Sequence, residues 1–362
     1  MKPFNVLFVS GSLHLSGSTV WINNLIVAME RLGVPCAHVI VGRDKQIKSQ
    51  ATYSFCTGQA KKNFLIRLFR ILRLHHWWPK LYAKIEDRYY CRVISNQLAE
   101  KLASQVLIIK DFSAPLPNFF VSPRFRVISV LHHQYDRRVE GKCDVLIAVS
   151  QAVMSASVKL GFPVDGVIFN PVDQKQILRK SEALVPEEED YIVFVGRLVP
   201  SKGVLPLLKA FIQLYQSGRV RHQLMFVGSG SSEKALQEQA RAAGLEKQVI
   251  FKGFQENPYP YIRHAELLVL PSYSESMGYV AVEASILGTS YLVSDFPAAK
   301  EFFPAENRFA SDVSEDEFVR NMENGIQALL ENPQVSLCDG VLEQMEPERV
   351  AKQFLRYQDV SS

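Results

Sequence analysis

Two successive series of short apolar runs, separated by polar or amphipathic stretches, constrain the fold of this 362-residue chain most strongly. Short apolar runs bounded by turn residues are typical of strands buried on both faces, and longer amphipathic stretches are typical of helices. Their alternation predicts parallel sheets wrapped by helices. Because a chain of this length exceeds one ordinary core, the sequence predicts an α/β protein with two doubly wound domains in tandem.

The first series predicts strands at Phe4–Ser10, Cys36–Val41, Val106–Ile109, Val127–Leu131, Val145–Val149 and Val167–Phe169, and a helix at Thr19–Leu32. The second predicts strands at Tyr191–Val195, Gln223–Val227, Val249–Lys252, Leu267–Leu270 and Tyr291–Ser294. Its expected helices are Leu205–Ser217, Glu233–Ala243, Tyr279–Leu287 and Glu315–Leu330. A polar stretch from Asn170 to Asp190 is expected to link the domains, which are placed at 1–173 and 174–345. The two domains are expected to face a cleft that holds the ligand.

Cysteine usage and charge narrow the class of protein. The five cysteines are widely spaced and form no Cys-x-x-Cys pair, which indicates a reducing compartment and argues against a disulfide scaffold or structural zinc. No stretch is both long enough and apolar enough to be a transmembrane helix. The first 180 residues carry 25 Lys and Arg against 11 Asp and Glu, although the net charge is only +4. The first half is therefore expected to face an anionic partner, either a membrane or nucleic acid.

Two loops that follow predicted strands have features of phosphate binding. Residues 10–18, Ser-Gly-Ser-Leu-His-Leu-Ser-Gly-Ser, open the first helix and either bring backbone N–H groups to a phosphate or form a plain turn. Residues 196–203 place Arg197 and Lys202 on a loop before a helix. Two cations there can neutralise a departing diphosphate, and the alternative is a solvated loop with two surface cations.

The segment 271–284 carries the strongest signal, two glutamates separated by seven residues. Glu275 lies in a loop after a predicted strand, and Glu283 lies within a mostly apolar helix. A carboxylate there is costly unless it has hydrogen-bond partners, which sugar and ribose hydroxyls can supply. The alternative is a helix-capping glutamate and a buried one satisfied by backbone.

These segments, taken in order, resemble a known family. Phe194-Val195-Gly196-Arg197 with Lys202-Gly203, Phe226–Gly230, Val249–Phe254, Leu270-Pro271-Ser272 and the two glutamates are similar to the donor domain of glycosyltransferase family 4, the retaining GT-B enzymes. The resemblance covers nearly all of residues 190–301 and is weaker in the first half. It implies two Rossmann-like domains facing a cleft, with the last helix, within 346–362, packed back on the first domain.

The resemblance also implies roles for residues of the second domain. Arg197 and Lys202 are expected to hold the donor diphosphate, and Glu283 the ribose. The donor sugar is expected to contact Glu275 and the backbone N–H groups of Ser276, Met277 and Gly278. Gly253 is counted with the donor-binding residues.

In the first domain, Gly17 is expected near the distal phosphate with Ser18 beside it. His132 is expected to approach the transferred sugar, and the alternative is a structural histidine at a strand end, which is the expectation for its neighbour His133. Ser18 replaces a glycine that is usual in the family. Two further departures are Ser276-Met277-Gly278, where a Gly-Phe-Gly-like run is common, and Phe296–Lys300, which lacks a Gly-Gly pair. The last of these leaves the donor's identity open.

The implied reaction is transfer from a UDP- or GDP-linked sugar to a glycan or lipid-linked acceptor with retention at the anomeric carbon. Catalysis is expected to rest on positioning and charge stabilisation, without a cofactor. No Asp-x-Asp motif is present, which fits the metal independence usual in GT-B enzymes. Two alternatives stay open, a sugar-nucleotide epimerase and a catalytically silent sugar-nucleotide-binding subunit. Nucleic-acid binding is disfavoured because the basic half has no recognition motif.

Residues 61–84 form a basic, apolar segment. On a helical wheel Arg67, Arg70 and Arg73 share one side, apolar residues fill most of the other, and Trp77 and Trp78 follow. This pattern favours an interfacial helix on anionic lipid, and the alternative is a domain helix with its apolar face in the core. The chain is therefore expected to be cytoplasmic and peripheral on the inner face of the plasma membrane. Cell-envelope polysaccharide, such as lipopolysaccharide, capsule or exopolysaccharide, is the expected product.

Overall fold

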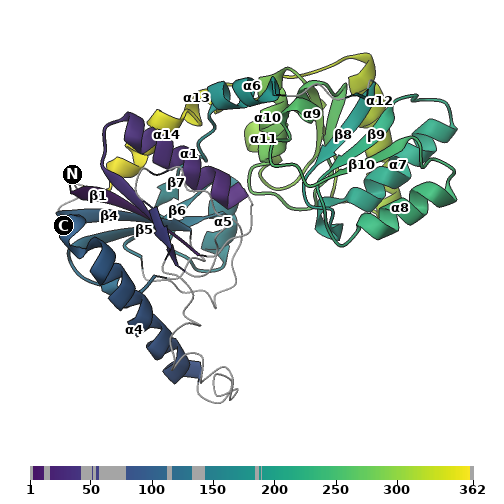
Figure 1. Ribbon diagram of the computed structural model, residues 1–362. Coiled ribbons are helices and arrows are strands. Elements are labelled where there is room, and N and C mark those ends of the chain that lie inside the picture. The colour runs from purple at the N-terminus through teal and green to yellow at the C-terminus, as the bar shows by residue number, and fades with distance from the viewer. Residues whose placement is uncertain are drawn as a thin grey trace. The chain divides into compact units, whose positions relative to one another are not determined.

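The computed structural model describes residues 3–11, 17–41, 51, 54–56, 79–111, 116–132, 143–183, 187–188 and 190–358. The chain divides into two compact units (Figure 1). Unit 1 comprises Met1–Val172 and Glu343–Ser362, and unit 2 comprises Asp173–Leu342. Each unit is a parallel sheet flanked by helices, which confirms the predicted α/β class.

The sheet of unit 1 has seven strands in the part of the chain described, in the order β3-β2-β1-β4-β5-β6-β7, with parallel pairing throughout. The strands are β1 (Phe4–Gly11), β2 (Cys36–Val41), β3 (Ser54–Cys56), β4 (Leu102–Asp111), β5 (Phe125–Leu131), β6 (Val145–Ala148) and β7 (Gly166–Val167). Its helices are α1 (Gly17–Arg31), α4 (Pro79–Leu98), α5 (Gln151–Lys159) and α14 (Pro347–Leu355), with short 3-10 turns at Ala99–Lys101 and Asn118–Phe120.

Side-chain alternation along β1 divides the core of unit 1 between two faces. Phe8 packs in a cluster with Trp21 of α1 and Phe354 of α14, whereas Val9 packs in a second cluster with Ile94 of α4. Helix α14 follows unit 2 in the sequence but lies against α1 (Figure 1). Residues from both ends of the chain therefore form one core.

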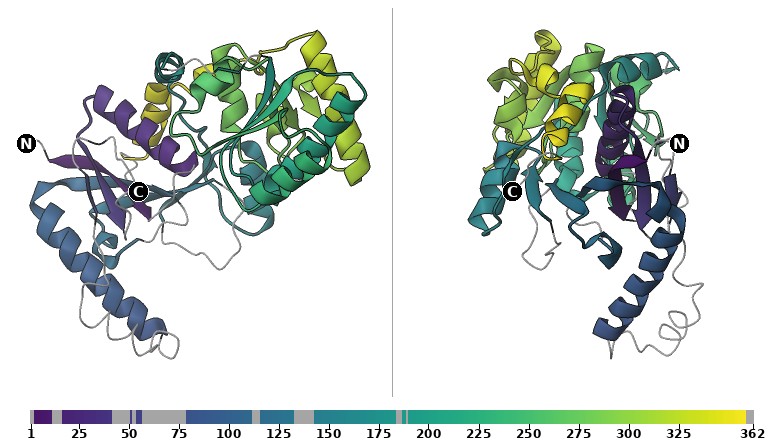
Figure 2. Two further views of the ribbon diagram at one scale, coloured as in Figure 1. Left: turned by 45° about the vertical axis from the view of Figure 1, so that its right-hand side comes forward. Right: turned by 90° about the vertical axis from the view of Figure 1, so that its left-hand side faces the viewer.

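Helix α4 contacts this core near its C-terminal end. Ile94 and Leu98 are fully buried, whereas Leu81 is 46% exposed. Figure 2 shows the helix running outward from the sheet of unit 1. Among the described side chains of α4, the fully buried ones therefore lie near its C-terminal end.

The sheet of unit 2 has six strands in the described residues, in the order β10-β9-β8-β11-β12-β13, again all parallel. They are β8 (Tyr191–Val195), β9 (Gln223–Val227), β10 (Val249–Gly253), β11 (Leu267–Leu270), β12 (Ser290–Ser294) and β13 (Arg308–Phe309). The connecting helices are α6 (Gln174–Ser181), α7 (Val204–Gln216), α8 (Glu233–Ala242), α9 (Tyr259–Arg263), α10 (Tyr279–Leu287), α11 (Ala299–Phe302) and α12 (Glu315–Glu331), with 3-10 turns at Pro200–Lys202 and Ala305–Asn307. Helix α13 (Val341–Gln344) crosses the boundary between the units.

One large cluster fills the face of this sheet that α7, α8 and α12 cover (Figure 1). Phe194 of β8 and Phe226 of β9 meet Phe211 of α7 and Met322 of α12 within it. Helix α12 begins with a reciprocal cap, in which Ser314 accepts from the Glu317 backbone N–H and the Glu317 carboxylate accepts from the Ser314 backbone N–H. The core on this face of the sheet is therefore apolar.

Two sequence predictions need correction. The expected strand Val167–Phe169 is only the two-residue strand β7, Gly166–Val167. The expected linker is partly helical, because Asp173 caps α6 through a 3.0 Å hydrogen bond from the Gln176 backbone N–H and Ile177 is buried. The polar composition of this stretch had favoured a linker, whereas it contains a short capped helix that belongs to unit 2.

The basic segment could be assessed only in part. Residues 61–78 lie outside the described residues, so interfacial binding by 61–84 stays a prediction. Across the residues that the structure does describe, none of the helices has the length and apolarity needed to cross a membrane.

Truncation of Phe354 to Ala should lower the free energy of unfolding of unit 1 by about 3–5 kcal/mol, because it empties a core position shared by α1 and α14. Urea denaturation followed by circular dichroism would measure the loss. The matched control is Lys352→Ala on the exposed side of the same helix, which should change little. Equal stability of the two variants would contradict this packing.

Candidate functional site

The loops at the carboxyl ends of the central strands of unit 2 are tied to one another by backbone hydrogen bonds. Leu198 N–H donates to the Ser229 carbonyl at 2.9 Å, and Tyr273 N–H donates to the Ser201 carbonyl at 3.1 Å. Gly228 N–H donates to the Gly253 carbonyl at 2.8 Å. The loops after β8, β9 and β11 and the end of β10 therefore form one rim. In open α/β sheets ligands bind at this edge.

Glycine allows the closest approaches within this rim. Gly228 has φ +143°, and a Cβ atom there would lie 1.9 Å from the Gly196 carbonyl oxygen. Gly203 has φ +65°, and a Cβ atom there would lie 2.0 Å from the Pro271 carbonyl oxygen. Any larger residue would force the loops apart, so these positions fix the geometry of the rim.

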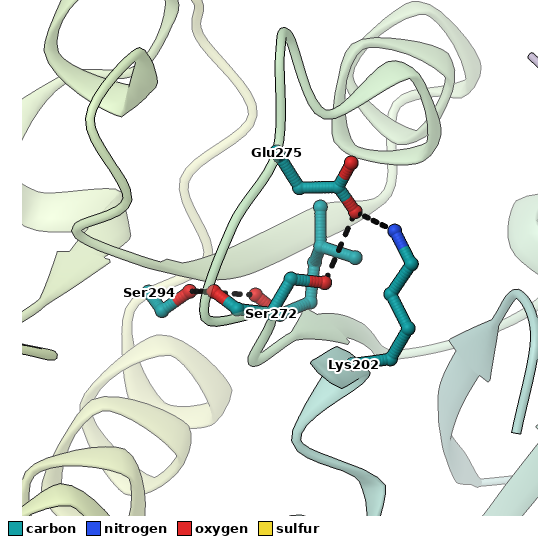
Figure 3. Close-up of polar contacts among 5 residues, drawn as sticks. Lys202, Ser272, Glu275 and Ser294 are labelled. Carbon is teal, nitrogen blue, oxygen red and sulfur yellow. Dashed lines mark hydrogen bonds and ion pairs between the residues drawn. The ribbon is translucent and has the colours of Figure 1, made fainter. Parts of the chain in front are cut away.

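Lys202 and Glu275 meet across the rim (Figure 3). Lys202 Nζ forms an ion pair with Glu275 Oε1, and Ser272 Oγ donates to the same oxygen at 3.0 Å. Ser294 Oγ in turn donates to the Ser272 carbonyl. The Lys202 and Glu275 side chains are 19% and 14% exposed, so the pair is shielded but still reachable from solvent. Such a pair places a cation beside a carboxylate that can accept hydrogen bonds from hydroxyl groups.

The other predicted donor residues of this region differ in position and exposure. Arg197 is exposed on the loop after β8, and its side chain makes no ion pair within the described residues. Gly253, with φ +67°, ends β10. The three residues after Glu275 lead into α10: Ser276 is partly exposed, Met277 is buried, and Gly278 is the N-cap with φ +75°. A helix N-terminus of this kind favours an anionic group.

Glu283 is buried on α10 and accepts a hydrogen bond from Tyr259 Oη at 3.3 Å. Burial raises the pKa of its carboxyl group from 4.5 to about 7, and the Tyr259 bond and the Lys180 charge oppose the rise. Tyr259 lies on α9 and Lys180 on α6, so three helices enclose this carboxyl group. Glu283 is thus separate from the Lys202–Glu275 pair and titrates near neutral pH.

In unit 1, His132 lies directly after β5 and is buried. Its Nε2 is 3.8 Å from Asp111 Oδ2, and its ring meets Trp21 edge-on at 4.7 Å between centroids. Gly17 and Ser18 form the first residues of α1. His133 lies outside the described residues. The structure therefore brings His132 together with an acidic side chain at the carboxyl ends of β4 and β5.

Three polar residues of these sites were not predicted as functional from the sequence. Asp111 comes two residues after a predicted strand, and its position at a strand end was the available signal. Ser272 was part of a matched motif but had no assigned role. Tyr259 lies in an Asn-Pro-Tyr-Pro-Tyr run, where nothing local indicates that it reaches a carboxylate on another helix. No group of three or more His, Cys, Asp or Glu side chains suited to hold a metal ion occurs among the described residues.

Comparison with protein families matches residues 174–339 to the model described as "Glycosyl transferases group 1". An uncharacterized glycosyltransferase of Methanocaldococcus jannaschii is 32% identical over 124 residues, 34% of this chain and 31% of that protein. An N-acetylgalactosamine-N,N'-diacetylbacillosaminyl-diphospho-undecaprenol 4-alpha-N-acetylgalactosaminyltransferase of Campylobacter jejuni is 25% identical over 167 residues, 46% of this chain and 44% of that protein. The matched segments thus span less than half the length of these curated relatives.

Solved structures resemble nearly the whole chain. The lipopolysaccharide outer core galactosyltransferase WaaB has a TM-score of 0.64 at 17% identity, covering 97% of this chain and 98% of WaaB. The Anabaena protein HepE in complex with UDP and glucose has a TM-score of 0.71 at 17% identity, covering 99% of this chain and 100% of HepE. This likeness confirms the predicted GT-B fold, built from two Rossmann-like units.

The raised pKa of Glu283 predicts a pH-dependent stability. The folded state disfavours the Glu283 carboxylate relative to the protonated acid. The contribution of Glu283 to the free energy of unfolding is therefore full below about pH 4.5 and is lost as pH rises through about 7. At about 1.4 kcal/mol per pKa unit, the loss is roughly 3 kcal/mol, and Glu283→Gln should remove it. Urea denaturation between about pH 5 and pH 8 measures the difference.

The exposed Glu246 offers a matched control, Glu246→Gln, which should keep the pH dependence of the wild type. The account of Glu283 would be wrong if Glu283→Gln lost stability with pH as steeply as the wild type does.

Proposed function

We propose that this chain is a retaining glycosyltransferase that moves a sugar from a UDP- or GDP-linked donor to a glycan or lipid-linked acceptor. The observation that carries the proposal is the Lys202–Glu275 pair at the carboxyl edge of the unit 2 sheet, directly before the N-terminus of α10. A cation, a carboxylate and a helix N-terminus at one place match the charges and hydroxyls of a nucleotide-diphosphate sugar. The family match over residues 174–339, and the UDP and glucose in the HepE structure, support the same donor class.

In this proposal the cations stabilise the departing diphosphate. Lys202 lies beside the rim with its charge balanced by Glu275, and Arg197 is exposed on the same loop. When the bond between the anomeric carbon and the diphosphate breaks, negative charge develops on the leaving oxygen, and both cations stabilise it. The acceptor hydroxyl bonds to the same face of the sugar and gives up its proton to the leaving phosphate. The two side chains supply the positive charge for this step, with no metal or cofactor required of the chain.

The carboxylates and the first unit orient the substrates. Glu275 Oε1 is occupied by Lys202 and Ser272, so its other oxygen is available for donor sugar hydroxyls, with the N–H groups of Ser276 to Gly278 alongside. Glu283 holds the ribose, and Gly253 also belongs to the donor-binding residues. In unit 1, Gly17 and Ser18 approach the distal phosphate and His132 the transferred sugar. Correct placement of reacting groups supplies a large part of such a rate enhancement.

The proposed acceptor and location rest on the basic segment and on the structural likeness. The basic segment 61–84 suits an anionic surface, and the chain resembles WaaB in fold. We therefore extend the proposal to cell-envelope polysaccharide synthesis, lipopolysaccharide, capsule or exopolysaccharide, at the cytoplasmic face of the plasma membrane.

Lys202→Ala and Arg197→Ala should each lower kcat by about 100-fold or more, the usual loss when one charge-stabilising donor is removed. The assay measures nucleoside diphosphate released from UDP- and GDP-sugars with and without a glycolipid extract as acceptor. Lys209→Ala, which removes an exposed ion pair with Asp316 on the same unit, is the matched control and should retain activity.

Circular dichroism and thermal melting should show that all three variants fold like the wild type. Turnover close to the wild-type value in both Lys202→Ala and Arg197→Ala would refute the role of these cations. Nucleotide release that is independent of acceptor would argue against transfer.

A further inference from the structure

Three oxygen-bearing side chains converge where α9 packs on α10. Tyr259 Oη donates to Glu283 Oε1 at 3.3 Å, a long hydrogen bond for a buried carboxyl group. Tyr279 lies one helical turn before Glu283, so the two side chains share a face of α10. The Tyr279 hydroxyl oxygen is buried and has no hydrogen-bond partner among the described residues. The group therefore has more hydrogen-bonding capacity than the protein itself uses.

Buried polar atoms without partners are uncommon in folded proteins, and each calls for a specific explanation. A small polar ligand is one such explanation. Tyr259 and Tyr279 are partly exposed as residues although the Tyr279 hydroxyl oxygen itself is buried, so this polar group lies close beneath the surface. Glu283 needs hydrogen-bond donors, and Tyr279 can both donate and accept. A pair of adjacent hydroxyl groups meets both needs at once.

We propose that Tyr259 is a positioning residue that holds the Glu283 carboxylate toward the vicinal hydroxyls of a donor ribose, and that Tyr279 supplies a further hydrogen bond to the same ribose. The inference rests on the proposed function and adds two residues to it. The Tyr259 bond is made within the protein itself, so it can orient the carboxylate for the ribose.

The groups that face Glu283 come from three helices. Tyr259 belongs to α9, Tyr279 to α10 itself, and Lys180 to α6, with Asp173 at the N-cap of α6 close to Tyr259. Tyr259 and Lys180 both favour the ionised carboxylate, whereas burial opposes it. Loss of the Tyr259 hydroxyl should therefore move the titration of Glu283 to higher pH.

The first measurement follows Glu283 directly in the full-length protein. Carbon-13 NMR of protein labelled at the glutamate carboxyl groups reports each titration, and Glu283→Gln identifies the signal. We expect Tyr259→Phe to raise the Glu283 midpoint by about one pH unit, the size expected for loss of one hydrogen bond to a charged group. Tyr261→Phe is the matched control, because Tyr261 lies on the same helix and forms no hydrogen bond to Glu283.

The second measurement is calorimetric binding of UDP and GDP across the same pH range. Tyr259→Phe should weaken binding about tenfold near pH 6, where a one-unit shift removes most of the remaining carboxylate, and by much less near pH 9. Tyr279→Phe should weaken binding of UDP or GDP but leave binding of the 2′,3′-dideoxy nucleotide unchanged. A merely structural role for either tyrosine would weaken binding equally at every pH and for both nucleotides.

The outcomes separate the two claims. An unchanged Glu283 midpoint in Tyr259→Phe overturns the positioning role, even if nucleotides bind well. Equal losses of ribose and dideoxyribose nucleotides in Tyr279→Phe overturn the ribose contact. Failure of the wild type to bind any nucleotide, with the expected shift of the Glu283 midpoint in Tyr259→Phe, overturns the proposed function and the ribose assignment together, while the contact between Tyr259 and Glu283 stands.

Discussion

Parallel pairing of β8 with β11 is the constraint on which the rest of the site depends. Both strands end at the same edge of the sheet, so the loops that follow them meet there although 73 residues separate Lys202 from Glu275. Glycines then let the loops approach closely enough for backbone hydrogen bonds between them. The ion pair is thus a consequence of strand order and loop packing. Both residues lie in turns or loops, and their approach to each other is set by the strands that these loops follow.

Glu275 and Glu283 of unit 2 lie in contrasting surroundings. Glu275 faces an ammonium group and a serine hydroxyl at a partly open rim, so it is held as an acceptor beside a cation. Glu283 is enclosed by three helices, with a tyrosine hydroxyl as its hydrogen-bond donor, and burial raises its pKa to about 7. Glu275 is therefore paired with a cation, whereas the buried surroundings of Glu283 favour its protonated form. In the proposed function, Glu275 contacts hydroxyl groups of the donor sugar and Glu283 contacts the ribose.

Much of this arrangement could be predicted because it depends on strand ends. Apolar runs located β8, β9, β11 and β12, and the polar residues just after β8 and β11 became the candidate site. Contacts between distant segments could not be predicted in the same way. The bond from Tyr259 to Glu283 depends on how α9 packs against α10, and the approach of Asp111 to His132 depends on the order of β4 and β5. Helix α6 was missed because its polar sequence resembles a linker until its cap and its buried Ile177 are seen.

The central claim is that the carboxyl edge of the unit 2 sheet binds a nucleoside diphosphate. Thermal unfolding with UMP, UDP, GMP and GDP tests it most directly, because a ligand that binds the folded state raises the melting temperature by mass action. The account predicts that UDP or GDP stabilises the protein more than its monophosphate does, and that Lys202→Ala abolishes this difference while leaving the smaller effect of the monophosphate. No stabilisation by any of the four nucleotides, or an equal diphosphate preference in Lys202→Ala, would contradict it.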